Sequence, residues 1–116
     1  MRYMMIIHHD ADALAKANQQ ALWGEYAAFN EALAKAGEGF SSGQRLTPGK
    51  QGTVVRSRAG KTQVLDGPYA DTQEQLAGYY FIDVPTLEQA VEWANRCPSS
   101  KYGAVEIRPI IEQAAS

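Results

Sequence analysis

The sequence predicts an α+β fold with a ferredoxin-like βαββαβ order and one extra hairpin. Stretches of strand-like and helix-like periodicity follow each other as strand, helix, hairpin strands, strand, helix, strand. The length of 116 residues suits one domain, which we expect to span residues 1–112, with 113–116 as a frayed tail. Two helices can cover only one face of the sheet. The first strand therefore shows whether the other face also needs a cover.

The segment Met1–His9 is predicted to be a strand that is apolar on both faces. Tyr3, Met5 and Ile7 fall on one face, whereas Met4 and Ile6 fall on the other. Such a strand belongs in the middle of a sheet that is covered on both sides. Because the helices cover one face, a second copy of the sheet is expected to cover the other, giving a homodimer with an enclosed interior.

The first helix is predicted from an apolar stripe with spacings of four, three, four and three residues. Its members are Leu22, Tyr26, Phe29, Leu33 and Ala36, and Gly37 provides a stop signal. The segment Ala11–Gln20 fits either a long loop or the first turns of this helix.

The middle of the chain is predicted to be a loop followed by a hairpin. Gly43–Gly52 contains the turn signal Pro48-Gly49, and two strands follow over Thr53–Arg58 and Lys61–Leu65, joined by Ala59-Gly60. Residues 71–74 resemble a capping box, which favours a short helical turn ending at Leu76.

The last third is predicted to contain a strand, a helix and a final strand. The strands cover Gly78–Val84 and Ala104–Ile111, and Thr86 opens the helix that Pro98 ends. The expected inward face of that helix carries Leu87, Ala90, Val91, Ala94 and Cys97.

Composition excludes several classes of function. A net charge of -2, with only Arg56, Arg58 and Lys61 clustered, argues against nucleic-acid binding. The single Cys97 fits a reducing compartment, and the apolar runs are too short for a membrane span, so we expect a cytoplasmic protein. No phosphate loop or nucleotide fingerprint is present, and no cofactor is expected.

The stretch Asp66-Gly67-Pro68-Tyr69-Ala70-Asp71-Thr72-Gln73-Glu74 resembles the DGPF(A/T)ETKE signature of the DGPF-motif branch of the YCII-related proteins. Residues 1–5, 78–80 and 102–110 are similar to the same branch. The resemblance implies a dimeric α+β barrel of ferredoxin-like subunits. It also implies a His–Asp pair as the active site proposed for the wider group, with the histidine on the first helix. Here the first helix carries no histidine, so only Asp66 has a counterpart, and Tyr69 replaces the phenylalanine of the signature.

Asp66 and His9 are the candidate catalytic residues. A partly buried Asp66 carboxylate at the mouth of a cavity can carry protons, and a histidine can assist it. The alternative is that Asp66 only accepts backbone hydrogen bonds in a turn. His8 and His9 point to opposite faces if the strand continues through them, so either one can face the dimer interior, or both can face solvent.

Tyr79, Tyr102, Glu106 and Arg108 are the candidate ligand-binding residues. Aromatic rings beside a few polar groups suit a small organic ligand, although core packing and ion pairing are the alternatives. No metal site is expected, because His8, His9 and Asp10 diverge along a strand. The sequence thus leaves two functions open. One is a cofactor-independent, lyase- or isomerase-like enzyme, and the other is a non-catalytic binding or regulatory module.

Overall fold

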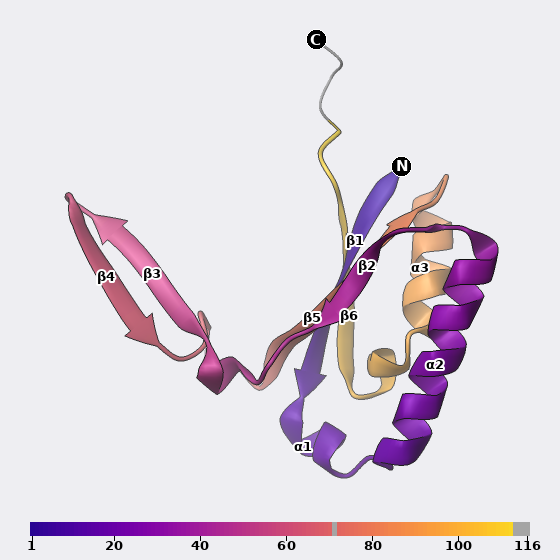
Figure 1. Ribbon diagram of the computed structural model, residues 1–116, viewed down its shortest axis with the longest axis horizontal. Coiled ribbons are helices and arrows are strands. Elements are labelled where there is room, and N and C mark those ends of the chain that lie inside the picture. The colour runs from indigo at the N-terminus through magenta and orange to yellow at the C-terminus, as the bar shows by residue number, and fades with distance from the viewer. Residues whose placement is uncertain (71, 113–116) are drawn as a thin grey trace.

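A computed structural model describes residues 1–70 and 72–112, and it shows an α+β architecture (Figure 1). The main sheet has the antiparallel strand order β2-β5-β1-β6. Its strands are β1 (Arg2–Asp10), β2 (Gly39–Arg45), β5 (Glu74–Asp83) and β6 (Gly103–Pro109). Read along these four strands, the order is that of a ferredoxin-like sheet, which confirms the predicted fold class.

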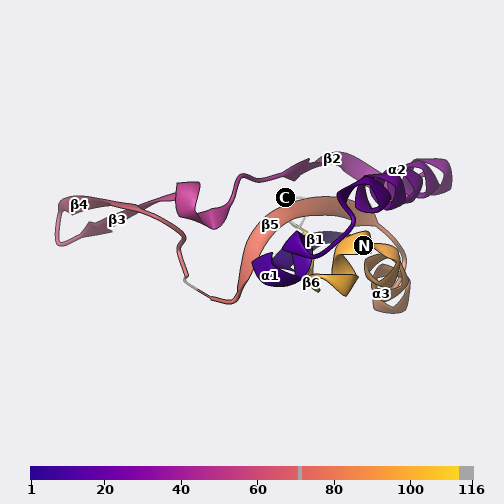
Figure 2. The ribbon, with the colours of Figure 1, turned by 90° about the horizontal axis from the view of Figure 1, so that it is seen from below.

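The two longer helices, α2 and α3, lie on one face of this sheet, and a separate hairpin projects on its other side (Figures 1 and 2). The helices are α1 (Ala11–Ala15), α2 (Gln19–Ala36) and α3 (Leu87–Arg96), with the short 3₁₀ turns η1 (Gly49–Gln51) and η2 (Pro98–Lys101). The hairpin pairs β3 (Thr53–Arg58) with β4 (Lys61–Asp66) and is hydrogen-bonded as a two-stranded sheet of its own.

The first helical region divides into two helices, because two residues cap separate starts. The Asp10 side chain accepts hydrogen bonds from the backbone N–H groups of Asp12 and Ala13, and Asn18 caps α2. Gly37 ends α2 in the left-handed conformation with φ 66°, as predicted for a C-terminal glycine. The open question over residues 11–20 is thereby settled as a short helix followed by a new N-cap.

Two predictions for the middle of the chain are wrong. Gly43 lies in β2 rather than in a loop, where a Cβ would collide with the carbonyl oxygen of Tyr79. Glycine therefore lets a segment of weak strand propensity pair closely with β5. The expected helical turn ending at Leu76 is instead the start of β5, because its residues pair with the end of β1. The proposed cap Asp71 and the predicted tail lie outside the described residues.

The core lies between the helices and the inward face of the sheet. Phe29 packs edge-to-face on Tyr80 and Trp93, with ring centroids 5.4 and 6.0 Å apart. The predicted face of α3 is only partly right, since Leu87 and Val91 are 53% and 50% exposed. Trp93 occupies the inward position instead. The buried cluster comprises Tyr3, Met5, Ile7, Phe29, Leu33, Ile82, Val84, Ala90, Trp93, Ala94 and Cys97.

Candidate functional site

The outward face of the sheet, called the open face below, has an apolar centre. Met4 and Ile6 of β1 alternate with residues buried beneath the helices, and they pair with Phe81 and Tyr79 of β5. The rings of Tyr79 and Phe81 meet edge-to-face with centroids 5.4 Å apart. All four residues are only partly buried in the single chain. An aromatic and aliphatic surface of this kind favours contact with an apolar molecule.

A row of polar side chains borders this apolar centre. His8 follows Ile6 on the open face, and its Nε2 lies 3.2 Å from a carboxylate oxygen of Glu106. An Arg108 nitrogen lies 3.9 Å from the other oxygen of Glu106. Both partners come from β6, whose register sets Glu106 beside Ile6 and Arg108 beside Met4. The imidazole, carboxylate and guanidinium therefore form one row across two neighbouring strands.

The chemistry of this row combines a proton carrier with an anion site. A carboxylate bonded to one imidazole nitrogen fixes the ring orientation and tautomer of a histidine. Arg108 is 68% exposed in its side chain, so its remaining N–H groups can bind a carboxylate or an enolate oxygen. The fold thus places three of the predicted ligand-binding residues on the open face: Tyr79, Glu106 and Arg108. His8 lies on the same face.

His9 lies on the opposite face, towards the helices. Its Nε2 is 2.6 Å from Oγ of the fully buried Ser99, which is also hydrogen-bonded to the Tyr26 hydroxyl. Burial, followed by the charge of Arg45, lowers the pKa of His9. Burial also raises the pKa of Tyr26 and of Cys97. A neutral, mutually bonded network of this kind holds the end of β1 against η2 and α2.

Sequence reasoning missed this network, and one signal for it was present. Tyr26 occupies the apolar stripe of α2, where a buried phenolic hydroxyl requires a polar partner. Ser99 follows Pro98 at the end of α3, but its burial depends on how η2 folds back onto the sheet. Within the described part of the chain, no buried side-chain nitrogen or oxygen lacks a hydrogen bond.

Asp66 lies away from the row of polar side chains, and the backbone of Tyr102 lies at the start of β6. Asp66 is the exposed last residue of β4 and pairs with Thr53 in the separate hairpin. Within residues 1–70 and 72–112 the Asp66 carboxylate forms no hydrogen bond. It also makes no contact with His9 of the same chain. The Tyr102 carbonyl accepts a hydrogen bond from the Asp10 backbone N–H at 2.8 Å, next to the start of β6.

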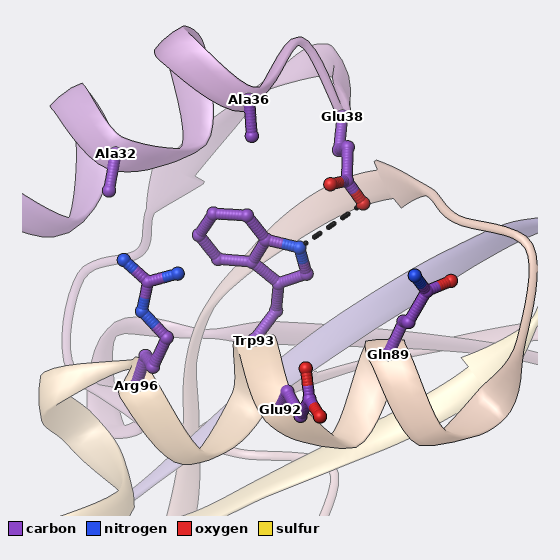
Figure 3. A pocket seen from close by; sticks show the side chains of 7 residues that line it. All are labelled: Ala32, Ala36, Glu38, Gln89, Glu92, Trp93 and Arg96. Carbon is purple, nitrogen blue, oxygen red and sulfur yellow. Dashed lines mark hydrogen bonds between the residues drawn. The ribbon is translucent and has the colours of Figure 1, made fainter.

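A concave region lies between α2 and α3, on the helical side of the molecule (Figure 3). It has a volume of about 300 Å³. Trp93 Nε1 donates to Glu38 at 3.3 Å, and the Arg96 guanidinium lies 4.4 Å from the Trp93 ring centroid. The polar groups of this groove, Glu38 and Arg96, therefore both contact Trp93.

The described residues give no support for a metal site or for a membrane-spanning helix. No three histidine, cysteine, aspartate or glutamate side chains among them gather closely enough to hold a metal ion. Within residues 1–70 and 72–112, no helix combines the length and apolar character that crossing a bilayer requires.

Comparison with known proteins identifies relatives of the chain. The family model described as YCII-related domain matches residues 1–114. An uncharacterized protein of Rhizobium meliloti (strain 1021) is 32% identical over 117 residues, covering 95% of this chain and 92% of the relative. The similarity therefore extends over the open face, the hairpin and the helices alike.

Proposed function

The chain belongs to the YCII-related family, and we propose that it binds a small organic molecule on its open face, in a cavity closed by a second copy. The signature at residues 66–74 further supports membership of the DGPF-motif branch. A cytoplasmic location accords with this proposal, because small metabolites are plentiful there and the single cysteine is a free thiol.

The observation that carries the proposal is that the row His8–Glu106–Arg108 shares the open face with the rings of Tyr79 and Phe81, with β1 between the rings and β6. Few polar groups next to an apolar surface are typical of small-molecule sites. The row offers a cation for an anionic group, and the ring pair offers a surface for a flat apolar group. We therefore propose a small aromatic or unsaturated acid, or a related carbonyl compound, as the ligand.

The proposed reaction is proton transfer of the lyase or isomerase type, without a cofactor. His8 would take a proton from a carbon next to a carbonyl or carboxylate, while Arg108 stabilises the negative charge that develops on oxygen. The proton then returns to a different atom of the ligand, or a leaving group departs with the electron pair. His9 would position His8 by holding β1 through Ser99, and Asp66 would be a second proton carrier.

The alternative is a non-catalytic binding or regulatory module that uses the same face. The exposure of Asp66 in the single chain favours this alternative, because a catalytic carboxylate is expected to sit in an enclosed pocket. The enzyme and the non-catalytic module would bind the same class of ligand. They differ in whether the protein transfers protons to and from the bound molecule.

Titration with benzoate, followed by amide chemical shifts in NMR spectra, tests the binding proposal. We expect shifts at Ile6, Tyr79 and Glu106, and an affinity reduced about tenfold or more in Arg108→Gln, as for a lost charge-assisted hydrogen bond. Arg58→Gln, which removes the same charge from the hairpin, serves as the control. Equal losses in both variants, or shifts confined to the helices, would refute the site.

Deuterium uptake by phenylpyruvate in heavy water separates the two functions. This probe carries a ring, a carboxylate and an acidic C–H group. Uptake faster than in buffer, and restored to the buffer rate by His8→Gln, supports the enzyme. Binding without accelerated uptake supports the non-catalytic module.

A further inference from the structure

The β3–β4 hairpin, residues 53–66, is called the arm here, and it has little support from the rest of its own chain. It forms a separate two-stranded sheet. Both views show it projecting away from the main sheet on the side opposite to α2 and α3 (Figures 1 and 2). Because an isolated two-stranded hairpin is at best marginally stable in water, the arm is expected to gain stability from a surface outside its own subunit.

One face of the arm is left without cover. Val55 and Val64 are directly paired across the strands, and each is 63% exposed. The pair Thr53–Asp66 lies on the same face, because every second residue of a strand points the same way. Exposed aliphatic pairs of this kind are typical of surfaces that bury themselves against a partner.

The opposite face of the arm differs in charge and cover. It carries three cations, Arg56, Arg58 and Lys61, along with Val54 and Leu65. The guanidinium of Arg56 lies 5.4 Å from the ring centroid of Tyr69, which partly covers this face from within the chain. The face of Val55 and Val64 is therefore the better docking face, and the cations can remain in solvent.

A second copy of the chain is the occupant that these features favour. The arm projects on the same side as the open face (Figure 2), so a copy that covers the open face lies next to the arm. Charge also favours this partner. The arm carries three cations and one carboxylate, a formal charge of +2, whereas the whole chain carries -2, which leaves -4 on the remainder. Because the cations lie on the face away from Val55 and Val64, this attraction acts at longer range and steers the arm towards the acidic remainder of another copy.

We propose that the arm docks on a second copy through the face of Val55 and Val64, and that Asp66 on that face is contributed to the interface. This inference rests on the proposed closure of the open face by a second copy. The inference also assigns a role to the exposed Asp66. Its carboxylate reaches the cavity region of the other subunit and not that of its own subunit.

Photo-crosslinking at four successive positions of β4 tests the docking face. The photoreactive residue p-benzoylphenylalanine replaces Gln63, Val64, Leu65 or Asp66 in turn, and denaturing gels report the fraction linked into a species of twice the chain mass. We expect yields at positions 64 and 66 to exceed those at 63 and 65 several-fold, because only the first pair shares the docking face. Positions 63 and 65 are matched controls on the same strand.

The other outcomes overturn the inference in distinguishable ways. Higher yields at 63 and 65, or equal low yields at all four positions in a protein that sediments as a dimer, would refute the docking arm while the dimer stands. A wild-type protein that sediments as a monomer and gives no cross-link would refute both the arm and the enclosed cavity. Peptide mapping of the linked species identifies the surface on which the arm docks.

Discussion

Two adjacent histidines of β1 have opposite surroundings, and strand geometry is the reason. His8 lies on the open face with Glu106, whereas His9 lies beneath the helices with Ser99. The irregular register near Ile7 adds its extra residue to β5, so the alternation along β1 continues unbroken. One histidine is therefore available to a ligand, while the other belongs to the packed interior.

His9 makes the stability of the protein depend on pH. Burial, and then Arg45, lowers the pKa of His9, so the unfolded chain binds a proton more readily than the folded one. The stabilisation is fully present above the ordinary histidine pKa of about 6.5 and is lost as the pH falls through the lowered pKa of the folded state. Between pH 7.5 and 5.5, wild type should lose more free energy of unfolding than His9→Gln.

Urea unfolding at the two pH values measures this difference. His8→Gln is the matched control, because it removes a neighbouring histidine from the open face and leaves the Ser99 contact in place. An equal decline in wild type and His9→Gln would mean that His9 does not contribute to the pH dependence.

At the level of single elements, the helices attach to the sheet through a few large side chains. Phe29 and Leu33 are 4% and 7% exposed on α2, as the apolar stripe predicts. On α3 the large inward residue is Trp93, which also donates a hydrogen bond to Glu38. Aromatic bulk at these positions fixes how the two helices pack together above β1 and β5.

Leu33→Ala should destabilise the protein by about 2–5 kcal/mol, the usual cost of truncating a buried leucine and leaving a cavity. Leu87→Ala is the matched control. Leu87 is 53% exposed on α3, so its truncation should change the free energy of unfolding by only about 0.5 kcal/mol. Chemical denaturation gives both values, and similar values for the two variants would contradict the packing of α2.

The elements differ in how well the sequence predicts them. Regular patterns with strong end signals, such as β1, the end of α2 and the arm, are predicted closely, because local propensity and tertiary packing agree. β2 is missed because its glycines and polar residues have weak strand propensity, and only pairing with β5 holds it extended. The start of β5 is misjudged because local helix signals there give way to hydrogen bonding with β1.

The candidate site is less predictable than the fold for a related reason. Tyr79, Glu106 and Arg108 are found by sequence, because alternation along strands identifies which residues share a face. Their alignment with His8 depends on the register between β1 and β6, which no local pattern determines. The distance of Asp66 from this row likewise depends on where the arm projects.

On the scale of the whole molecule, the single chain leaves one sheet face bare. Met4, Ile6, Tyr79 and Phe81 are only partly buried there, and Leu76 is 47% exposed opposite His8. The opposite face packs against the helices. A second copy on the bare face would give both faces of β1 an apolar environment, as its residue pattern predicts.

Sedimentation velocity at micromolar concentration should therefore give twice the chain mass of 12.7 kDa. Leu76→Lys should shift the protein towards the monomer, because it would bury an unpaired charge in the interface. Val91→Lys is the control with matched exposure, 50% on the outer side of α3, and it should remain dimeric. If Leu76→Lys remains fully dimeric, the open face is not the dimer interface.

The central position of β1 determines the order in which the protein is able to assemble during synthesis. β1 leaves the ribosome before the other strands, yet both of its neighbours, β5 and β6, are translated later, and Tyr3 pairs with Pro109. Contacts so distant in sequence form slowly. β1 is therefore unable to pair on both sides until β5 and β6 have been synthesised. During that time the nascent chain exposes an unpaired apolar strand, which is the form most easily captured by a chaperone or lost to aggregation.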